Sequence, residues 1–193
     1  MNYPNGIKKT DIINNQSKEI SYKNRGMTLE ADINASNEYY RNMDIAYIYK
    51  KPTPIKITKV DYPSRDKAVI KEAFFTVPST TDYNGIYCGK YIDFEAKETK
   101  SKTSFALSNI HPHQINHLEN ITRHSGIAFL IVRFTTLNET FLLPADTLLN
   151  YIKNNKKKSI PIHLFREKGF TLKDEYNPRI DYIKIVKNII GGK

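Results

Sequence analysis

The sequence predicts an α/β domain built on a mixed sheet, because short strand-like runs alternate with helical segments along most of the chain. Residues 127–134 form a near-continuous apolar run, which is typical of a central strand buried on both faces. Residues 113–124 carry apolar side chains at helical spacing, and residues 181–190 form a last amphipathic helix that ends at two glycines. A length of 193 residues is sufficient for one such domain with its own core.

The remaining elements follow from the same periodicities. A helix is expected from about residue 26 to 40 and a helix at residues 144–155. Strands are expected at residues 44–49, 55–60, 68–77, 80–87, 91–97 and 140–143, with an edge strand at 160–165. Residues 1–21 are expected to form a flexible basic arm, which leaves residues 22–193 as the folded domain.

The charge balance favours a polyanionic partner. The chain has 30 Lys and Arg against 20 Asp and Glu, which gives a net charge of +10. Because phosphate contacts release condensed counterions, this excess favours nucleic-acid binding over a merely basic protein. No apolar run approaches the ~18 residues of a membrane span, and the one cysteine, Cys88, excludes an internal disulfide or a cysteine-based zinc site. The expected location is the cytoplasm, with no membrane partner.

Two acidic side chains are expected to face each other across a hairpin. If residues 88–89 form a tight turn, Asp82 lies opposite Glu95 and Thr80 lies opposite Lys97. Opposed Cβ atoms are ~4.5–5.5 Å apart, and two carboxylates that close repel unless a cation lies between them or one is protonated. Magnesium prefers carboxylate oxygens. The register therefore predicts a metal site with a lysine and a hydroxyl beside it.

The alternative is a surface ladder of charges on an exposed sheet face. A Glu-x-Lys pattern alone usually has that explanation, and a one-residue slip in pairing would turn one strand's side chains to the other face. The aspartate placed directly opposite and the basic charge balance favour the metal site.

Asp82 followed by Glu95, Ala96 and Lys97 is the pattern of the PD-(D/E)xK nuclease superfamily, although no proline precedes this aspartate. Longer strings resemble the RecU family of Holliday junction resolvases over roughly residues 21–190. The matching strings are NRGMTLE at 24–30, KPTPI at 51–55, DYP at 61–63, TTDYNG at 80–85 and YIDFEAKET at 91–99, with weaker likeness at 113–114, 159–161 and 178–182.

The resemblance implies a single restriction-endonuclease-like domain. Its central mixed sheet is flanked by helices, and a β stalk is inserted at about residues 54–79. The implied metal ligands are Thr80, Asp82, Glu95 and Gln114, and the implied catalytic residues are Lys97, Asp82 and Glu95. The superfamily also suggests Glu30 as an outer acid near the site. For Gln114 and Glu30 the alternative is an ordinary polar side chain at the start of a helix.

The activity implied by the resemblance is magnesium-dependent hydrolysis of a phosphodiester in four-way junction DNA, with Mn²⁺ as a substitute ion. Because a junction needs two symmetric nicks, a C2 homodimer is expected. Recombinase and branch-migration proteins are the partners associated with the family. Two alternatives stay open, namely a related endonuclease acting on linear duplex DNA and a non-catalytic protein that binds branched DNA.

The expected DNA contacts are basic and aromatic residues before the first helix, on the stalk and after the active strand. They are Arg25, Lys56, Arg65, Lys67, Phe74, Phe75, Lys100 and Lys102. The two phenylalanines either stack on unpaired bases or lie in the core. The histidines at 113, 117 and 124 share one helical side, which is more typical of an exposed helix surface than of zinc binding, because no His-Glu-x-x-His arrangement is present.

Overall fold

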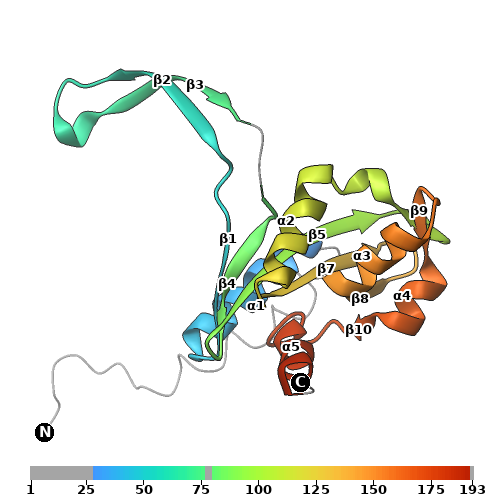
Figure 1. Cartoon of the computed structure of the whole chain (residues 1–193). Helices are drawn as coiled ribbons and strands as arrows, with labels where there is room; N and C mark the ends of the chain where they lie inside the picture. The colour runs from blue at the N-terminus through green and yellow to red at the C-terminus, as the bar shows by residue number, and fades with distance from the viewer. Residues whose placement is uncertain (1–27, 77–79, 192–193) are drawn as a thin grey trace, which may run out of the picture.

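A six-stranded mixed sheet forms the centre of this protein (Figure 1). The computed structural model describes residues 28–76 and 80–191. Across the sheet the strands are β1 (Tyr47–Lys50), β4 (Tyr83–Tyr87), β5 (Lys90–Thr99), β7 (Ile127–Phe134), β8 (Glu139–Pro144) and β10 (Phe170–Leu172). The central pair β5 and β7 is parallel and every other pair in this sheet is antiparallel. The predicted α/β class with a mixed sheet is confirmed.

Helices cover both faces of the sheet (Figure 1). Helices α1 (Leu29–Asn42) and α5 (Tyr182–Gly191) lie on one face, and α2 (Pro112–Arg123), α3 (Ala145–Asn154) and α4 (Ile162–Lys168) lie on the other. Strand β7 supplies both cores by alternation: Phe129 and Ile131 pack with α1 and α5, whereas Leu130 and Val132 pack with α2 and α3. None of the helices in the described part of the chain is long and apolar enough to span a membrane.

Some predicted boundaries are wrong. The expected edge strand at 160–165 is a short strand, β9 (Ser159–Pro161), followed by α4. Pro161 is the N-cap of this helix, and the apolar run continues into a helix that buries Phe165. Short apolar runs fit either element, so their periodicity could not decide. Strand β9 pairs with β6 (Ser104–Ala106), which the short helix η2 (Leu107–Asn109) follows.

A two-stranded hairpin projects far from the body of the protein (Figure 1). It consists of β2 (Ile55–Asp61) and β3 (Val69–Phe75), with the 3₁₀ turn η1 (Arg65–Lys67) at its tip, and is called the stalk below. It is inserted between β1 and β4, which pair with each other in the body. Every residue of β2 and β3 is exposed. An isolated two-stranded hairpin is only marginally stable in water, and this one buries no residue of either strand.

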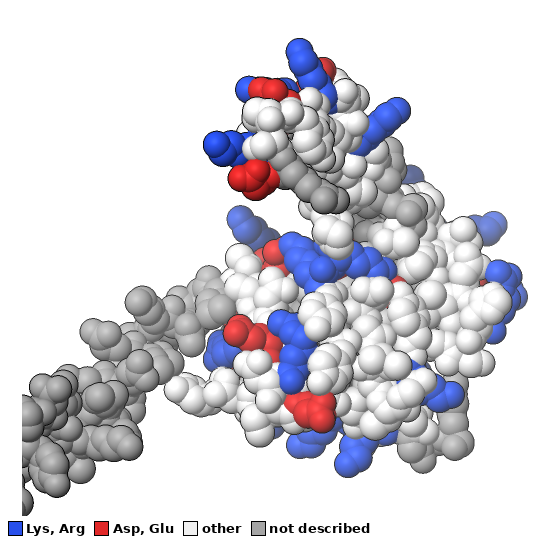
Figure 2. Space-filling model, turned by 90° about the vertical axis from the view of Figure 1, so that its left-hand side faces the viewer, with Lys and Arg blue, Asp and Glu red and all other residues white. Residues whose placement is uncertain are grey.

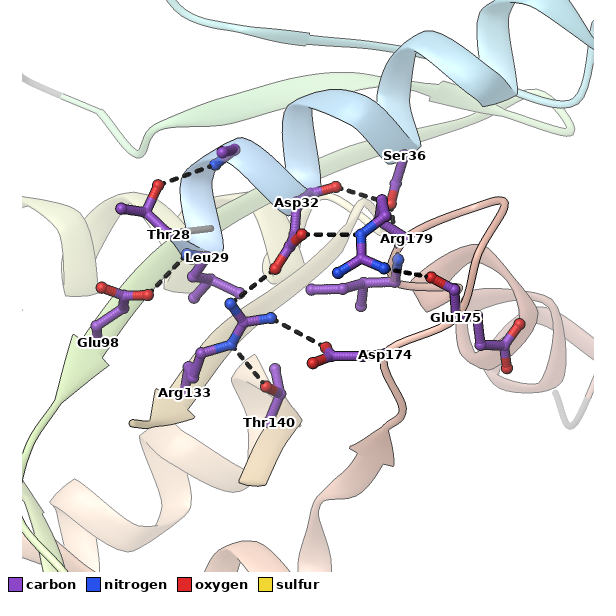
Figure 3. A network of polar contacts seen from close by, with 12 residues as sticks. Thr28, Leu29, Asp32, Ser36, Glu98, Arg133, Thr140, Asp174, Glu175 and Arg179 are labelled. Atoms are coloured by element: carbon purple, nitrogen blue, oxygen red, sulfur yellow. Dashed lines mark hydrogen bonds and ion pairs between the residues drawn. The ribbon is translucent and has the colours of Figure 1, made fainter. Parts of the chain in front are cut away.

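A buried ionic network fastens α1 to the sheet (Figure 3). The carboxylate of Asp32 is 1% exposed and lies 2.7 Å from Arg133 Nη1, and it accepts a hydrogen bond of 3.1 Å from Arg179 Nε. Arg133, on β7, also donates to Thr140 of β8 and to Asp174. These five residues, called the Asp32 cluster, join α1, the sheet and the segment before α5.

The first turn of α1 also contacts the end of β5. The backbone N–H of Leu29 donates to Glu98 Oε1 at 2.7 Å, and the hydroxyl of Thr28 accepts from the N–H of Ala31 at 3.2 Å (Figure 3). Both contacts satisfy N–H groups that a helix start leaves unpaired. The N-terminus of α1 is therefore fixed beside β5.

We expect Asp32→Ala to lower the free energy of unfolding by about 3–5 kcal/mol, because the buried guanidinium of Arg133 and the partly buried one of Arg179 lose their shared anion. Urea denaturation measures this. The exposed ion pair between Glu139 and Arg166 provides the control, since Glu139→Gln should change stability very little. Equal losses in the two variants would contradict the assignment of the Asp32 cluster as the main anchor of α1.

Candidate active site on strand β5

The hairpin of β4 and β5 has the register that the sequence predicted. Tyr83 lies opposite Phe94 and Tyr87 lies opposite Lys90. The turn between them places Cys88 at φ 47° and Gly89 at φ 73°. A two-residue turn with both φ angles positive matches the right-handed twist of the flanking strands. Alternation along β5 then places Asp93, Glu95 and Lys97 on the face covered by α2.

The ladder ends one residue earlier than expected, which corrects the predicted pairing of Asp82 with Glu95 and of Thr80 with Lys97. The last pair is Tyr83 with Phe94, so Asp82 and Thr80 precede the strand. The main chain at Asp82 does not pair with β5 but hydrogen-bonds to Lys51 and to the side chain of Glu95. Its carbonyl accepts from the N–H of Lys51 at 2.8 Å, and its own N–H donates to Glu95 Oε2 at 3.0 Å. The two acids still meet, through backbone and side chain instead of a strand pair.

Glu95 is a carboxylate with no exposed side-chain surface. Its Oε1 lies 2.5 Å from Lys97 Nζ, but that atom has no hydrogen bond of regular geometry within the described residues. Burial and the nearby charge of Asp82 raise the pKa of Glu95 to about 7, and Lys97 opposes this shift. A cation between the two carboxylates would offset their mutual repulsion and favour the ionised form of Glu95.

The donor set at this point fits a magnesium ion. Magnesium is commonly held by one or two carboxylates and keeps several waters, and Asp82 and Glu95 supply two. In the stretches 28–76 and 80–191, no group of three or more His, Cys, Asp or Glu side chains is arranged to hold a metal. The hydroxyl of Thr80, half-buried two residues before Asp82, offers a neutral oxygen as a further ligand.

Gln114 lies in the first turn of α2 and is buried. Its Oε1 accepts from the N–H of His111 at 3.0 Å, which is one half of a capping box. Because α2 connects two parallel strands, it runs antiparallel to β5. His117 of α2 contacts Asp93, so Gln114, one turn earlier, lies along the strand toward Glu95.

Glu30 lies in the first turn of α1 and forms an ion pair with Lys50 at the end of β1. Both side chains are about half exposed. Burial first, and then the charges of Glu30, Asp82 and Glu95, raise the pKa of Tyr83. Glu30 therefore lies close enough to act electrostatically on the same tyrosine as the two site acids, and its direct contact is with a lysine.

The residues expected to contact DNA lie on exposed surface where the structure describes them. Phe74 is 56% and Phe75 is 83% exposed, so their placement in the core is wrong. Lysines 56, 67, 100 and 102 are exposed as well. Arg25 lies outside the described residues, as does the side chain of Arg65 and the whole arm at 1–21.

One cluster beside the site was missed. Asp93, two residues before Glu95, is fully buried and contacts Lys51, Thr81, Tyr91 and His117. Alternation on β5 could have placed it on the face of Glu95, but its partners come from distant segments. The histidine contact also corrects a prediction: His117 is partly buried against Asp93 and does not lie on an exposed helix surface.

Comparison with known proteins finds matches to one family over nearly the whole chain. The family model of recombination protein U, RecU, matches residues 24–188. A protein named Holliday junction resolvase RecU from Geobacillus sp. (strain WCH70) is 54% identical, over 97% of this chain and 96% of its own. One of the same name from Staphylococcus aureus (strain JH9) is 51% identical, over 98% of this chain and 96% of its own.

Among solved structures, Hjc, a Holliday junction resolvase of Archaeoglobus fulgidus, matches 53% of this chain and 78% of its own with 13% identity. Its TM-score of 0.37 is too low to support a conclusion. The full-length matches in sequence are sufficient, and the chain belongs to the RecU family.

Proposed function

We propose that this protein is a magnesium-dependent endonuclease that resolves Holliday junctions. The relatives reported above are named Holliday junction resolvases, and magnesium dependence is the part of the proposal that rests on the site. The observation that carries the proposal is the meeting of Asp82 and Glu95 beside Lys97, on a face of β5 where charge is otherwise costly. An intact set of this kind argues against a non-catalytic junction-binding protein.

Asp82 and Glu95, with Thr80 and Gln114 as neutral oxygen donors, would hold the metal. When bound, Mg²⁺, or Mn²⁺ in its place, polarises the scissile phosphate and lowers the pKa of a coordinated water. Lys97 keeps its ammonium within reach of the same position, with 27% of its side chain exposed. It can orient the attacking water and offset the negative charge that develops on the phosphate. Glu30 stays a candidate outer acid.

Basic and aromatic residues supply the surface for DNA. Figure 2 shows lysine and arginine side chains gathered on the body directly below the stalk, and further ones on the stalk itself. Lys56 and Lys67 lie on the stalk, and Lys100 and Lys102 follow β5. Such residues can track phosphates, and the exposed rings of the stalk can stack on bases that are unpaired at a junction centre. Arg25 and Arg65 stay predicted contacts.

Paired nicks require two sites related by a two-fold axis, so we expect a homodimer acting on one junction. An endonuclease for linear duplex would share the metal site but would not need the stalk. Association with recombinase and branch-migration proteins and a cytoplasmic location stay predictions.

Magnesium affinity should rise with pH, because a bound cation requires ionised Glu95 and its pKa is near 7. The metal-free fold should lose stability as pH rises from about 4.5 to about 7, since the folded state holds the proton more tightly than the unfolded state does. The gain in melting temperature on adding Mg²⁺ should be larger at about pH 8 than at about pH 6. Glu95→Gln should abolish that difference, and a gain independent of pH in the wild type would exclude Glu95 as a ligand.

Asp82→Asn and Lys97→Ala should each abolish cleavage of a four-way junction while junction binding survives, because binding rests on the stalk and the basic surface. Cleavage and gel-shift assays with matched junction and linear duplex in Mg²⁺ measure both properties. Paired, symmetric nicking of the junction is the expected wild-type result. Wild-type rates in both variants would show that the site is elsewhere, and equal cutting of duplex would favour the duplex endonuclease.

Shortening the stalk should weaken preference for junctions more than binding to duplex. Because Lys56 and Phe74 are paired, residues 57–73 can be replaced by an Asn-Gly turn that keeps the base of the hairpin. This removes four basic and three acidic residues, so Lys157→Gln, on a distant exposed loop, is a control with the same loss of one net positive charge. Affinities for both substrates are compared, and equal losses on junction and duplex would remove the special role of the stalk.

A further inference from the structure

We propose that Asp93 is a positioning residue that fastens helix α2 and the two chain segments leading to and from the stalk to strand β5. It would thereby hold the stalk in one orientation relative to the residues assigned to the metal site. The effect on cleavage rests on the proposed function, whereas the effect on stalk orientation does not.

The carboxylate of Asp93 is fully buried on the same face as Glu95 and Lys97. Its Oδ2 accepts from Lys51 Nζ at 2.7 Å and from the hydroxyl of Tyr91 at 2.9 Å, and it lies 3.2 Å from His117 Nε2. Its Oδ1 accepts a hydrogen bond from the hydroxyl of Thr81. One buried anion therefore accepts three hydrogen bonds, from Lys51, Thr81 and Tyr91, and lies against the ring of His117.

Two of these donors stand where the stalk leaves and re-enters the body. Lys51 directly follows β1, on the chain that leads up to the stalk, and Thr81 directly precedes Asp82, on the chain that returns from it. Lys51 Nζ also donates to the hydroxyl of Thr81 at 3.0 Å, and the N–H of Lys51 donates to the carbonyl of Asp82 at 2.8 Å. The segment that leads to the stalk and the segment that returns from it are thus joined to each other and, through Asp93, to the central sheet.

The third segment is helix α2. His117 meets Asp93 one helical turn after Gln114. A change in this contact would shift the first turn of α2 relative to β5, and Gln114 with it. Asp93 therefore has a structural connection to both sides of the metal site, Thr80 and Asp82 on one side and Gln114 on the other.

Charge, and not volume alone, gives Asp93 this role. Lys51 is only 17% exposed, so an uncharged residue at position 93 would leave a largely buried ammonium without its anion. The ammonium would then move toward water, together with the segment between β1 and β2 that carries it. An asparagine has nearly the same shape, so Asp93→Asn isolates the effect of charge.

The matched control is Asp32→Asn. Asp32 is also a buried carboxylate with two cationic partners, but those partners lie on the opposite face of the sheet and none belongs to the stalk (Figure 3). Both substitutions should lower the melting temperature. A purely structural role for Asp93 would make the two variants alike in every other respect.

The experiment measures stalk orientation in the full chain without DNA. Spin labels are attached at Lys67→Cys on the stalk tip and Glu167→Cys on α4, in a background with Cys88→Asn to remove the exposed native thiol. Asparagine tolerates the positive φ at that turn. Labelled chains are diluted with unlabelled ones, so that pulsed electron–electron double resonance reports the distance between the two labels within one chain.

Asp93→Asn should broaden or shift the distance distribution, and Asp32→Asn should leave it unchanged. A folded Asp93→Asn protein with the original distribution, or equal changes in both variants, would overturn the proposal. If Asp93→Asn does not fold, two milder variants decide the question. Tyr91→Phe removes one donor to Asp93, and Lys51→Met with Asp93→Asn removes both charges together. An unchanged distribution in both would also overturn it.

Cleavage kinetics provide the second readout. Asp93→Asn should lower kcat on the junction about 10- to 100-fold, because small misplacement of reacting groups has effects of that size. It should also reduce the preference for junction over duplex, which Asp32→Asn should preserve. If the wild type cuts no junction, the proposed function fails while the distance measurement still tests Asp93. If the wild type cuts and the distances do not change, the inference about Asp93 fails alone.

Discussion

Strand β5 carries Asp93, Glu95 and Lys97 on one face and apolar side chains on the other, and helices cover both faces. A central strand of this kind cannot leave a charge unsatisfied, because a buried ion without a partner costs several kcal/mol. The three residues meet this constraint differently. Asp93 is surrounded by donors from the protein itself, whereas Glu95 keeps a buried oxygen without a regular hydrogen bond. That difference separates a structural anchor from a position suited to a cation.

The sequence could predict the features of this site that depend on local properties, but not those that depend on contacts between distant segments. The register of β4 and β5 follows from a turn that needs positive φ at residues 88–89 and from strict alternation, both of which are local properties. The end of the ladder is not local. There the carbonyl of Asp82 accepts from the N–H of Lys51, which lies on the other side of the inserted stalk in the sequence. The contacts of Asp93 with Lys51 and His117 likewise join distant segments, which no spacing rule reveals.

Elements with a long, regular pattern were predicted well, whereas the short run at 160–165 was not. The run at 127–134 could only be a strand buried on both faces, and the structure places it there with the predicted limits. The run at 160–165 could continue as strand or helix, and packing of Phe165 in the core decided for helix. The Asp32 cluster was not foreseen either, because an arginine within an otherwise apolar strand gives no indication of which acids it will meet.

The stalk poses a mechanical problem that apolar packing is poorly suited to solve. Two chain segments, one before β2 and one after β3, connect the stalk to the body. All residues of its strands are exposed, so little apolar area is available to fix its direction. Apolar contacts are also non-directional and tolerate sliding. Hydrogen bonds to a charged group are stronger than neutral ones and have preferred angles. The buried carboxylate of Asp93 binds both Lys51 and Thr81 and therefore constrains both connecting segments at once. It lies on β5, the strand that also carries Glu95 and Lys97. In the proposed function, an anchor on the same strand as Glu95 and Lys97 would keep the hairpin in a fixed position relative to the candidate site.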